Sequence, residues 1–590
     1  MPNNYRIITG FNFRGGPGRS LFRLSTISCK IADMNLIKQM VLAAVICGSS
    51  FIALSGGTTV SAGSKPTPSP TPATRPRTTP TPTPALSPTP LPATKPVQTI
   101  EELQSTIRQR LFDPAVRRGR VGVKVVSLSS GKLVFEQDSE KYFMPASNMK
   151  NFTVAAAMEK LGPDFKFVTS VYANSLPDSS GTIKGDLRIY GRGDVSISTA
   201  FFGTSPTDPE TYYKGIDRLV DRISVAGIKK IEGSIVGDES YFKGFYIPGG
   251  WEWDDLQAYY GAEVSALPIN DNAVDINVSP GASGSPCNVT ISPANKIFQV
   301  VNTCTTGSSS STRTLSVVKK LDRNIVEVSG SMPAGKPAYV NSIAITRPAE
   351  LFVALLKRRL EATGIVVTGD ARLLPPNVKP TQTIEVAKLE SPPFAQIAAK
   401  TMKPSQNMFT ETILWTLGEK SVEMERAYKD IPGDPNNPTL PARENSSDLG
   451  LTAVKAFLKQ IGAADDGIIQ SDGSGLSRHD LITPSAVVTL YTYMAKQSKN
   501  AQAWRESLTI AGVDGTLANR LKGTAAEANF RGKTGTIDQV SALSGYMTTA
   551  AGEQLVVSII VNNVGGPTRT RTSLADDIVT ALANFSGKID

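Results

Sequence analysis

The sequence predicts an α+β fold in which helices flank an antiparallel sheet and a long strand-rich segment interrupts the domain. Residues 529–563 read as a meander of apolar strands joined by tight turns, and a helix closes the chain. Helical patterns return from about residue 392, after residues 165–390 have shown mainly short Val- and Ile-rich runs between Gly, Ser, Asn and Pro. Helices next to a terminal meander indicate one α+β domain, and the strand-rich stretch indicates insertions into it.

The folded part is expected to begin with a helix and a hairpin. Thr99 followed by Glu102 has the spacing of a capping box, which predicts a helix to about Leu111. Residues 121–128 and 133–136 are apolar runs joined by Ser-Ser-Gly-Lys, the pattern of two strands and a turn. We expect this hairpin to pair with the C-terminal meander, so that both ends of the domain meet in one sheet.

This pattern divides the folded chain into three parts. Residues 98–165 and 391–590 form the two halves of one domain, and residues 166–390 form the inserted strand-rich domains. Within the second half, helices are expected over 407–417 and 446–461.

Two further segments precede the folded part. Residues 1–62 are a leader in which an apolar run, 40–54, and the small residues Val60-Ser61-Ala62 predict a secretory signal peptide, with Met34 as an alternative start. An uncleaved leader would instead tether the protein to a membrane. Residues 63–97 contain twelve prolines and form a Pro/Thr-rich linker that cannot bury a core.

The charge distribution argues against a function in nucleic-acid binding. Leader and linker carry ten Lys or Arg and one acidic residue, which accounts for +9 of the net charge of +10. The remainder offers no broad basic face, so we do not expect nucleic acid as a partner.

His479 is the only histidine in the sequence, which excludes a zinc site built on several histidines. No metal or organic cofactor is implied.

Cys287 and Cys304 are the two cysteines of the folded part. After export to an oxidising compartment they would form a disulfide that closes a short loop, worth about 3 kcal/mol. The alternative is two buried free thiols.

Three short motifs occur in order along the chain. They are Ser147-Asn148-Met149-Lys150, Ser405-Gln406-Asn407 and Lys533-Thr534-Gly535. The first pattern also occurs at Ser129 and Ser316, but Ser129 lies in the predicted hairpin turn and Ser316 in a strand-like run. Only Ser147 opens an apolar helix, which is predicted to reach Leu161.

A serine and a lysine three residues apart on a helix can form a nucleophile and its base. The two side chains share one helix face, and a buried lysine can remove the hydroxyl proton that makes serine a poor nucleophile. Burial and a second cation lower the pKa of such a lysine. Lys150 would be the base for Ser147, and Lys533 would be the second cation. The helix N-terminus leaves the Ser147 N–H free to bind an oxyanion.

The third motif lies in a predicted edge strand, which can hydrogen-bond an extended peptide. Gly535 lets that backbone approach closely, and the Thr536 N–H would complete the oxyanion hole. Thr534 together with the lysine before it would bind a terminal carboxylate. Ser405 would relay a proton to the leaving amine, and Asn407 would bind a substrate amide while orienting the base.

Together the three motifs resemble the signature set of penicillin-binding proteins and serine β-lactamases. Ser405 lies 258 positions after Ser147, and this spacing resembles that of the low-molecular-mass class C penicillin-binding proteins, the D-alanyl-D-alanine carboxypeptidase/endopeptidase family. In that family extra domains are inserted between the first two motifs. Residues 161–165, 185–187, 249–255, 472–478 and 512–516 share the resemblance. The departures are Gln406, where Asp is common, and Asp480, where Asn often follows the histidine.

The resemblance implies a transpeptidase-like fold and an exported enzyme of the periplasm or cell envelope. Its substrates would be peptidoglycan stem peptides, cut through an acyl-enzyme on Ser147, and β-lactams would acylate the same serine. Asp194 is a candidate ligand for an ammonium on the peptide stem. Two rival interpretations remain: a β-lactamase of the same fold, and an inactive scaffold protein that binds the cell wall.

Overall fold

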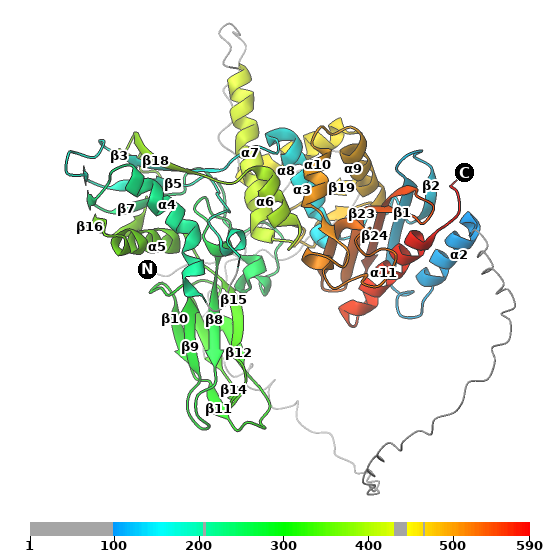
Figure 1. Cartoon of the computed structure of the whole chain (residues 1–590), viewed down its shortest axis with the longest axis horizontal. Helices are drawn as coiled ribbons and strands as arrows, with labels where there is room; N and C mark the ends of the chain where they lie inside the picture. The colour runs from blue at the N-terminus through cyan, green and yellow to red at the C-terminus, as the bar shows by residue number, and fades with distance from the viewer. Residues whose placement is uncertain (1–97, 204–207, 430–444, 464–465, 590) are drawn as a thin grey trace, which may run out of the picture. The chain divides into compact units, whose positions relative to one another are not determined.

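The computed structural model describes residues 98–203, 208–429, 445–463 and 466–589. Two distant parts of this chain build one six-stranded antiparallel sheet, in the order β2-β1-β24-β23-β22-β21 (Figure 1). Its strands are β1 (Arg120–Ser127), β2 (Leu133–Gln137), β21 (Thr509–Ile510), β22 (Arg531–Ile537), β23 (Val540–Thr548) and β24 (Gln554–Asn562).

The predicted hairpin pairs with the predicted meander. Strand β1 runs antiparallel to β24 in a continuous register from Arg120 opposite Asn562 to Ser127 opposite Leu555. In β24 every residue after Gln554 is buried, because both faces of this central strand are covered. The sheet therefore joins residues more than four hundred positions apart, as the sequence pattern predicted.

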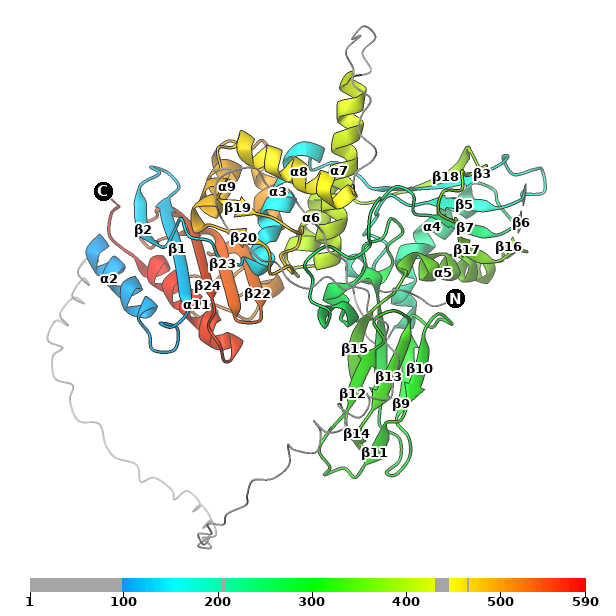
Figure 2. The ribbon, with the colours of Figure 1, turned by 180° about the vertical axis from the view of Figure 1, so that it is seen from behind.

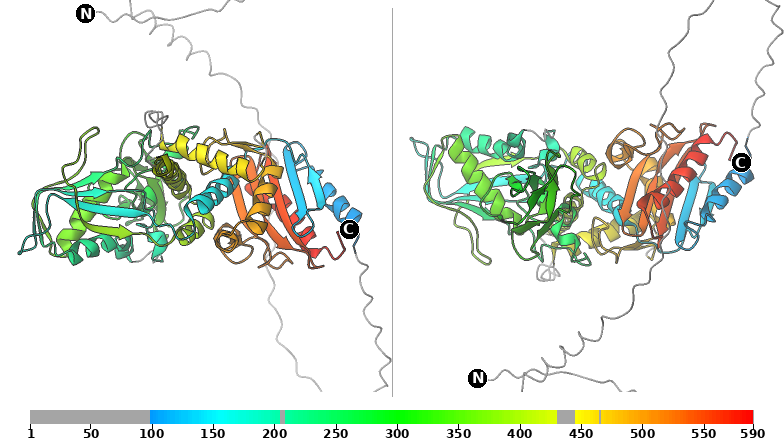
Figure 3. Two further views of the ribbon diagram at one scale, coloured as in Figure 1. Left: turned by 90° about the horizontal axis from the view of Figure 1, so that it is seen from above. Right: turned by 90° about the horizontal axis from the view of Figure 1, so that it is seen from below.

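Helices cover both faces of this sheet (Figure 3). The terminal helices α2 (Ile100–Leu111) and α11 (Thr568–Asn584) pack together on one face, and α9 (Pro484–Lys496) contacts β1 and β24 on the other. The capping box at Thr99 and Glu102 is present.

Helix α3 (Lys150–Leu161) is the central helix of the domain. Its first nine residues are buried, since it is covered by α6 (Phe394–Met402), α7 (Asn407–Lys429), α8 (Ser446–Gln460) and α9. A helix that is apolar around most of its surface is expected in such a position. The remaining elements of this layer are α10 (Ala501–Ser507), β19 (Ile468–Ile469) and β20 (Leu481–Ile482).

The insertion contains several small sheets and two long helices (Figure 2). A five-stranded mixed sheet has the order β17-β7-β5-β3-β18, and α4 and α5 pack on each other and on its strands. The bounds are β3 (Val168–Ala173), β4 (Thr182–Lys184), β5 (Leu187–Tyr190), α4 (Lys214–Val225), β6 (Lys230–Glu232), β7 (Ile235–Asp238), β8 (Ala273–Ser279), β9 (Asn288–Ser292), β10 (Gln299–Asn302), β11 (Thr305–Gly307), β12 (Ser316–Lys319), β13 (Ile325–Ser329), β14 (Ser331–Pro333), β15 (Tyr339–Ala344), α5 (Pro348–Ala362), β16 (Val366–Val367), β17 (Ala371–Leu373) and β18 (Ile384–Glu390).

The description of the insertion as strand-rich was therefore incomplete. Helix α4 buries Ile216, Leu219, Val220 and Ile223, which have the three- and four-residue spacing of an amphipathic helix. This signal was present in the sequence and was obscured by the Gly- and Pro-rich strands around it.

The Cys287–Cys304 disulfide is present, with the two cysteines 17 residues apart. It joins the β8–β9 turn to the segment after β10. Closing a loop of this length lowers the conformational entropy of the unfolded chain. We therefore expect replacement of both cysteines by alanine to lower the free energy of unfolding by about 3 kcal/mol. Denaturant unfolding under non-reducing conditions, with the parent protein alongside, measures the difference. An unchanged midpoint would contradict the prediction.

The predicted signal peptide and linker, residues 1–97, lie outside the described residues. Within the described ranges, no helix combines the length and apolar character needed to cross a membrane.

Candidate active site

The candidate nucleophile Ser147 lies in a single turn of 3-10 helix, Ala146–Met149, that precedes α3. The helix therefore begins one turn later than the sequence predicted. Ala146 has a φ of 46°, a left-handed conformation that is costly for a residue with a side chain and is typical of functional sites. The turn leaves Ser147 half-buried while its neighbours are buried.

Lys150 lies directly against the nucleophile. Its Nζ is 3.0 Å from Ser147 Oγ, 2.6 Å from Asn407 Oδ1 and 2.7 Å from the Ser474 carbonyl oxygen. The lysine side chain is fully buried, so these three acceptors fix the position of the amine. A neutral amine held at this distance is placed to accept the hydroxyl proton.

The environment of the two buried lysines favours the loss of a proton. Burial lowers the pKa of Lys150 from 10.5 to about 8, although nearby carboxylates oppose the change. Burial also lowers the pKa of Lys533 well below 10.5, and the charge of Lys150 adds to that effect. We expected the second cation to act on Lys150. Burial is the main cause of the lowered pKa at both lysines. The repulsion between the two positive charges lowers the pKa of Lys533.

The second motif faces the nucleophile from the start of α7. Ser405, whose φ is 68°, accepts a hydrogen bond from Lys533 Nζ at 2.8 Å. Asn407 accepts from Lys150 and donates through Nδ2 to the Tyr260 carbonyl oxygen at 2.9 Å. The amide is therefore in direct contact with the candidate base, and the inserted part of the chain supplies its second partner.

The third motif lies on β22, next to the short outer strand β21. Strand β21 pairs only with Arg531 and Gly532, so residues 533–537 form a free edge. A Cβ on Gly535 would lie 2.5 Å from the Pro145 carbonyl oxygen. The glycine is therefore needed for the close approach of the nucleophile's turn, a reason that concerns the protein itself rather than a bound peptide.

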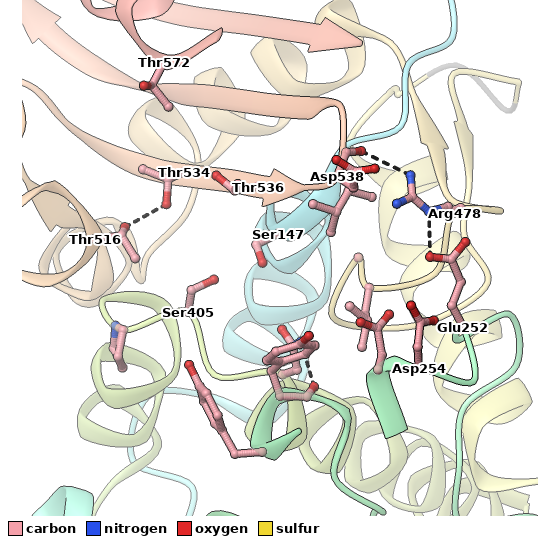
Figure 4. A pocket seen from close by; sticks show the side chains of 18 of the residues that line it. Ser147, Glu252, Asp254, Ser405, Arg478, Thr516, Thr534, Thr536, Asp538 and Thr572 are labelled. Atoms are coloured by element: carbon pink, nitrogen blue, oxygen red, sulfur yellow. Dashed lines mark hydrogen bonds and ion pairs between the residues drawn. The ribbon is translucent and has the colours of Figure 1, made fainter. Parts of the chain in front are cut away.

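A cleft of about 710 Å³ opens over these residues (Figure 4). On one side, Thr534 Oγ1 and Thr516 Oγ1 are 2.7 Å apart, next to Thr536. Arg520 also lines the cleft. The other side carries four carboxylates and a guanidinium, from Glu252, Asp254, Asp255, Asp538 and Arg478. The cleft thus has hydroxyl groups and a strand edge at one side, and a mainly acidic wall at the other.

Asp194 does not line this cleft. It is fully buried in the inserted part, where Oδ1 accepts from the backbone N–H and the hydroxyl of Ser196. Burial raises the pKa of Asp194 to about 6. The cleft is lined by five of the other predicted residues, Ser147, Ser405, Asn407, Thr534 and Thr536. The buried Lys150 and Lys533 contact Ser147 and Ser405, and Gly535 lies between the two threonines on β22.

Sequence reasoning missed several residues that support the site. Thr516, on the segment that follows β21, and the Tyr260 carbonyl could not be placed from motif spacing. Glu411 stands four residues after Asn407, and this helical spacing was a usable signal. Among the described residues, no group of three or more His, Cys, Asp or Glu side chains is arranged to hold a metal ion.

Comparison with known proteins gives consistent similarities. The sequence pattern of the D-Ala-D-Ala carboxypeptidase 3 (S13) family matches residues 103–430 and 438–584, insertion included. A D-alanyl-D-alanine carboxypeptidase of Actinomadura sp. is 32% identical over 501 residues, which cover 83% of this chain and 86% of the relative. The D-alanyl-D-alanine carboxypeptidase DacB of Haemophilus influenzae is 29% identical over 75% of this chain and 85% of its own. The crystal structure of penicillin binding protein 4 (dacB) from Haemophilus influenzae matches with a TM-score of 0.65 and 26% identity, over 81% of this chain and 98% of that one.

Proposed function

Because the chain belongs to the D-Ala-D-Ala carboxypeptidase 3 (S13) family and is a serine-type D-alanyl-D-alanine carboxypeptidase, we propose that it works through an acyl-enzyme on Ser147. One observation carries the assignment. The fully buried Lys150 amine lies 3.0 Å from the half-buried Ser147 hydroxyl, at the floor of the cleft. Within the described chain, neither Ser129 nor Ser316 has such a partner: Ser129 contacts Ser127 and Glu553, and Ser316 is exposed on β12.

In the acylation step, neutral Lys150 takes the Ser147 proton while Oγ attacks the carbonyl carbon of the penultimate D-alanine. The carbonyl oxygen becomes an oxyanion, which the N–H groups of Ser147 and Thr536 stabilise. When the tetrahedral intermediate collapses, the amide C–N bond breaks and the leaving amine takes a proton from Ser405. Lys533 Nζ, 2.8 Å from that hydroxyl, replaces the proton.

In the second half-reaction, water attacks the ester carbonyl. Before this step the proton that Lys150 took from Ser147 passes to Lys533, whose own proton left with the amine, so Lys150 is neutral again. Lys150 then accepts a proton from the water and returns it to Ser147 Oγ as the ester bond breaks. The products are the free D-alanine released first and the shortened stem peptide released second. Each half-reaction uses the same oxyanion donors and the same base.

The two sides of the cleft match the two ends of such a substrate. The hydroxyls of Thr534 and Thr516, with the Lys533 ammonium behind them, can bind the terminal carboxylate of the leaving D-alanine. The acidic wall around Asp254 fits a stem peptide that carries an ammonium, the role that sequence reasoning gave to Asp194. Arg478 beside this wall, 3.0 Å from Glu252, can pair with a second carboxylate.

The proposed partners are peptidoglycan stem peptides, with β-lactams as covalent inhibitors of the same serine. A disulfide within the insertion fits a protein exported to an oxidising compartment, and we place this enzyme in the periplasm or cell envelope. Whether its leader is cleaved or acts as a tether would be read from the N-terminus of the mature protein.

The low pKa of Lys150 predicts the pH dependence of acylation. The reactive form is the neutral amine, so the rate should rise with pH and level off above about pH 8. The rising part of the profile is its acid limb. If the pKa of Lys150 had its ordinary value, about 10.5, the acid limb would extend above about pH 10. The measurement is the second-order rate of penicillin acylation between about pH 6 and about pH 10. A rate that still rises steeply at the upper end would contradict the assignment.

Muropeptide digestion tests the function directly. The purified protein is incubated with a pentapeptide muropeptide and with a cross-linked dimer, and the masses of the products are measured by mass spectrometry. Loss of one terminal D-alanine shows carboxypeptidase action, and conversion of dimer to monomers shows endopeptidase action. If neither substrate changes while penicillin is rapidly hydrolysed, the β-lactamase interpretation replaces ours. If nothing reacts, the scaffold interpretation does.

A further inference from the structure

Glu411 is a fully buried carboxylate on α7, four residues after Asn407. Residues at this spacing share a helix face, so the carboxylate lies on the side of α7 that contacts the base. Its Oε1 accepts the Ser474 N–H at 2.7 Å, and its Oε2 accepts the Gly473 N–H at 3.0 Å. Both oxygens act as acceptors, so the carboxyl group binds two backbone N–H groups of one loop.

The loop that Glu411 holds also contacts the base. The Ser474 carbonyl oxygen accepts from Lys150 Nζ at 2.7 Å, and the Gly473 carbonyl oxygen accepts from Thr153 Oγ1 on α3 at 2.8 Å. The loop is therefore fixed between α7 and α3, with Glu411 on one side of its backbone and the base-bearing helix on the other. If Glu411 released these two amides, the carbonyl that orients Lys150 would lose its support.

We propose that Glu411 is a positioning residue for acylation: through the Gly473–Ser474 backbone it holds the carbonyl that orients Lys150, and its negative charge retains the lysine proton. The proposal rests on the roles given above to Ser147 and Lys150. It assigns to the second motif's helix a function beyond the three motif residues themselves.

The charges around Lys150 come from three elements. Asp472 and Asp480 on the loop and Glu411 on α7 raise the pKa of Lys150 against the effect of burial. Lys533 on β22 carries the opposite sign. Burial and, after it, the negative charge of Asp472 raise the pKa of Glu411 itself, while the two backbone N–H donors and the Lys150 charge oppose that rise.

Glu411 is the carboxylate best suited to a test. Asp472 accepts from the N–H groups of Gly475 and Ser477 within its own loop, so its replacement would disrupt the loop directly. Glu411 acts from a separate helix, and glutamine has nearly the same shape. A glutamine amide offers one acceptor in place of two and carries no charge.

The test is the pH profile of penicillin acylation for the full-length Glu411→Gln protein. We expect the plateau rate to fall by about tenfold to a hundredfold, since Lys150 is less well placed. Because a negative charge is lost, the acid limb should move to lower pH by about one unit. A limb that stays in place or moves to higher pH would overturn the proposal.

Glu411→Asp keeps the charge and shortens the side chain, so its limb should stay at the parental pH while its plateau falls. If Glu411→Gln does not fold, this variant carries the test, and a moved limb would then overturn the proposal. The matched control is Glu419→Gln, another buried carboxylate on α7, which accepts from Ser446 Oγ at 2.6 Å. The acid limb of the Glu419→Gln profile should lie at the parental pH, even if the substitution changes the thermal stability of the protein.

Parallel variants separate this proposal from the proposed function. If Ser147→Ala is still acylated, the proposed function fails, and the positioning role of Glu411, which rests on it, fails as well. If Ser147→Ala is inert but the Glu411→Gln limb is unmoved, the function stands and only the positioning role fails.

Discussion

Replacement of Ser147 by alanine should abolish covalent labelling by penicillin. The hydroxyl oxygen forms the bond to the acyl group, and the other cleft hydroxyl that contacts a buried amine, Ser405 beside Lys533, is assigned to proton transfer. We expect D-alanine release from a pentapeptide to fall by at least about 10⁴-fold, as for other activated serine nucleophiles. Mass spectrometry of the protein after exposure to penicillin reads the adduct, and product analysis reads the turnover.

The sequence offers a matched control for this substitution. Ser316 also begins an S-x-x-K pattern, but it is exposed on β12 of the insertion. Ser316→Ala should be labelled at the parental rate. Persistent labelling of Ser147→Ala would show that another residue is the nucleophile, and loss of labelling in both variants would point to a fold defect.

Replacement of Lys150 by methionine should have the second-largest effect on acylation. Methionine fills similar space but cannot accept a proton, so the reaction loses its general base, a contribution of about 10²–10⁴-fold. Asn407 and the Ser474 carbonyl would also lose the amine that joins them. The measurement is the second-order acylation rate at the plateau of the pH profile. Since the base is absent, the residual rate should lack the acid limb seen in the parent.

Lys160→Met is the control on the same helix. Lys160 lies at the exposed end of α3, where its amine contacts Gln460. This variant should keep the parental rate and the parental limb. A Lys150→Met protein that retains both would exclude Lys150 as the base and would leave Lys533 as the nearest alternative.

The insertion contributes more to the site than an attached module would. The Tyr260 carbonyl accepts from Asn407, Trp251 donates to Asp472 at 2.7 Å, and Asp271 accepts from Gln406. All three contacts reach the second motif or the loop that supports Lys150. Gln406 stands where an aspartate is common in the family, and an aspartate would place a second carboxylate against Asp271. The departure noted in the sequence is thus matched by its partner in the insertion.

Much of the fold and the chemistry could be predicted from the sequence. The capping box at Thr99, the hairpin and the terminal meander have local patterns, and local patterns depend on propensity and on the alternation of apolar residues. The three motifs were also local, since a serine and a lysine three residues apart on a helix must meet. Their order and spacing indicate the family to which the chain belongs.

Only the tertiary structure decided which groups complete the site. Asp194 is buried and does not line the cleft, whereas Glu411 and the Ser474 carbonyl support the base, because these contacts depend on how α3, α7 and a loop pack rather than on any one segment. The same is true of the lysine pKa values. A sequence shows that two lysines belong to motifs, but the extent of their burial, which is the main cause of both shifts, is set by the elements that surround them. Local order was therefore determined by the sequence alone, and the electrostatics of the site by long-range packing.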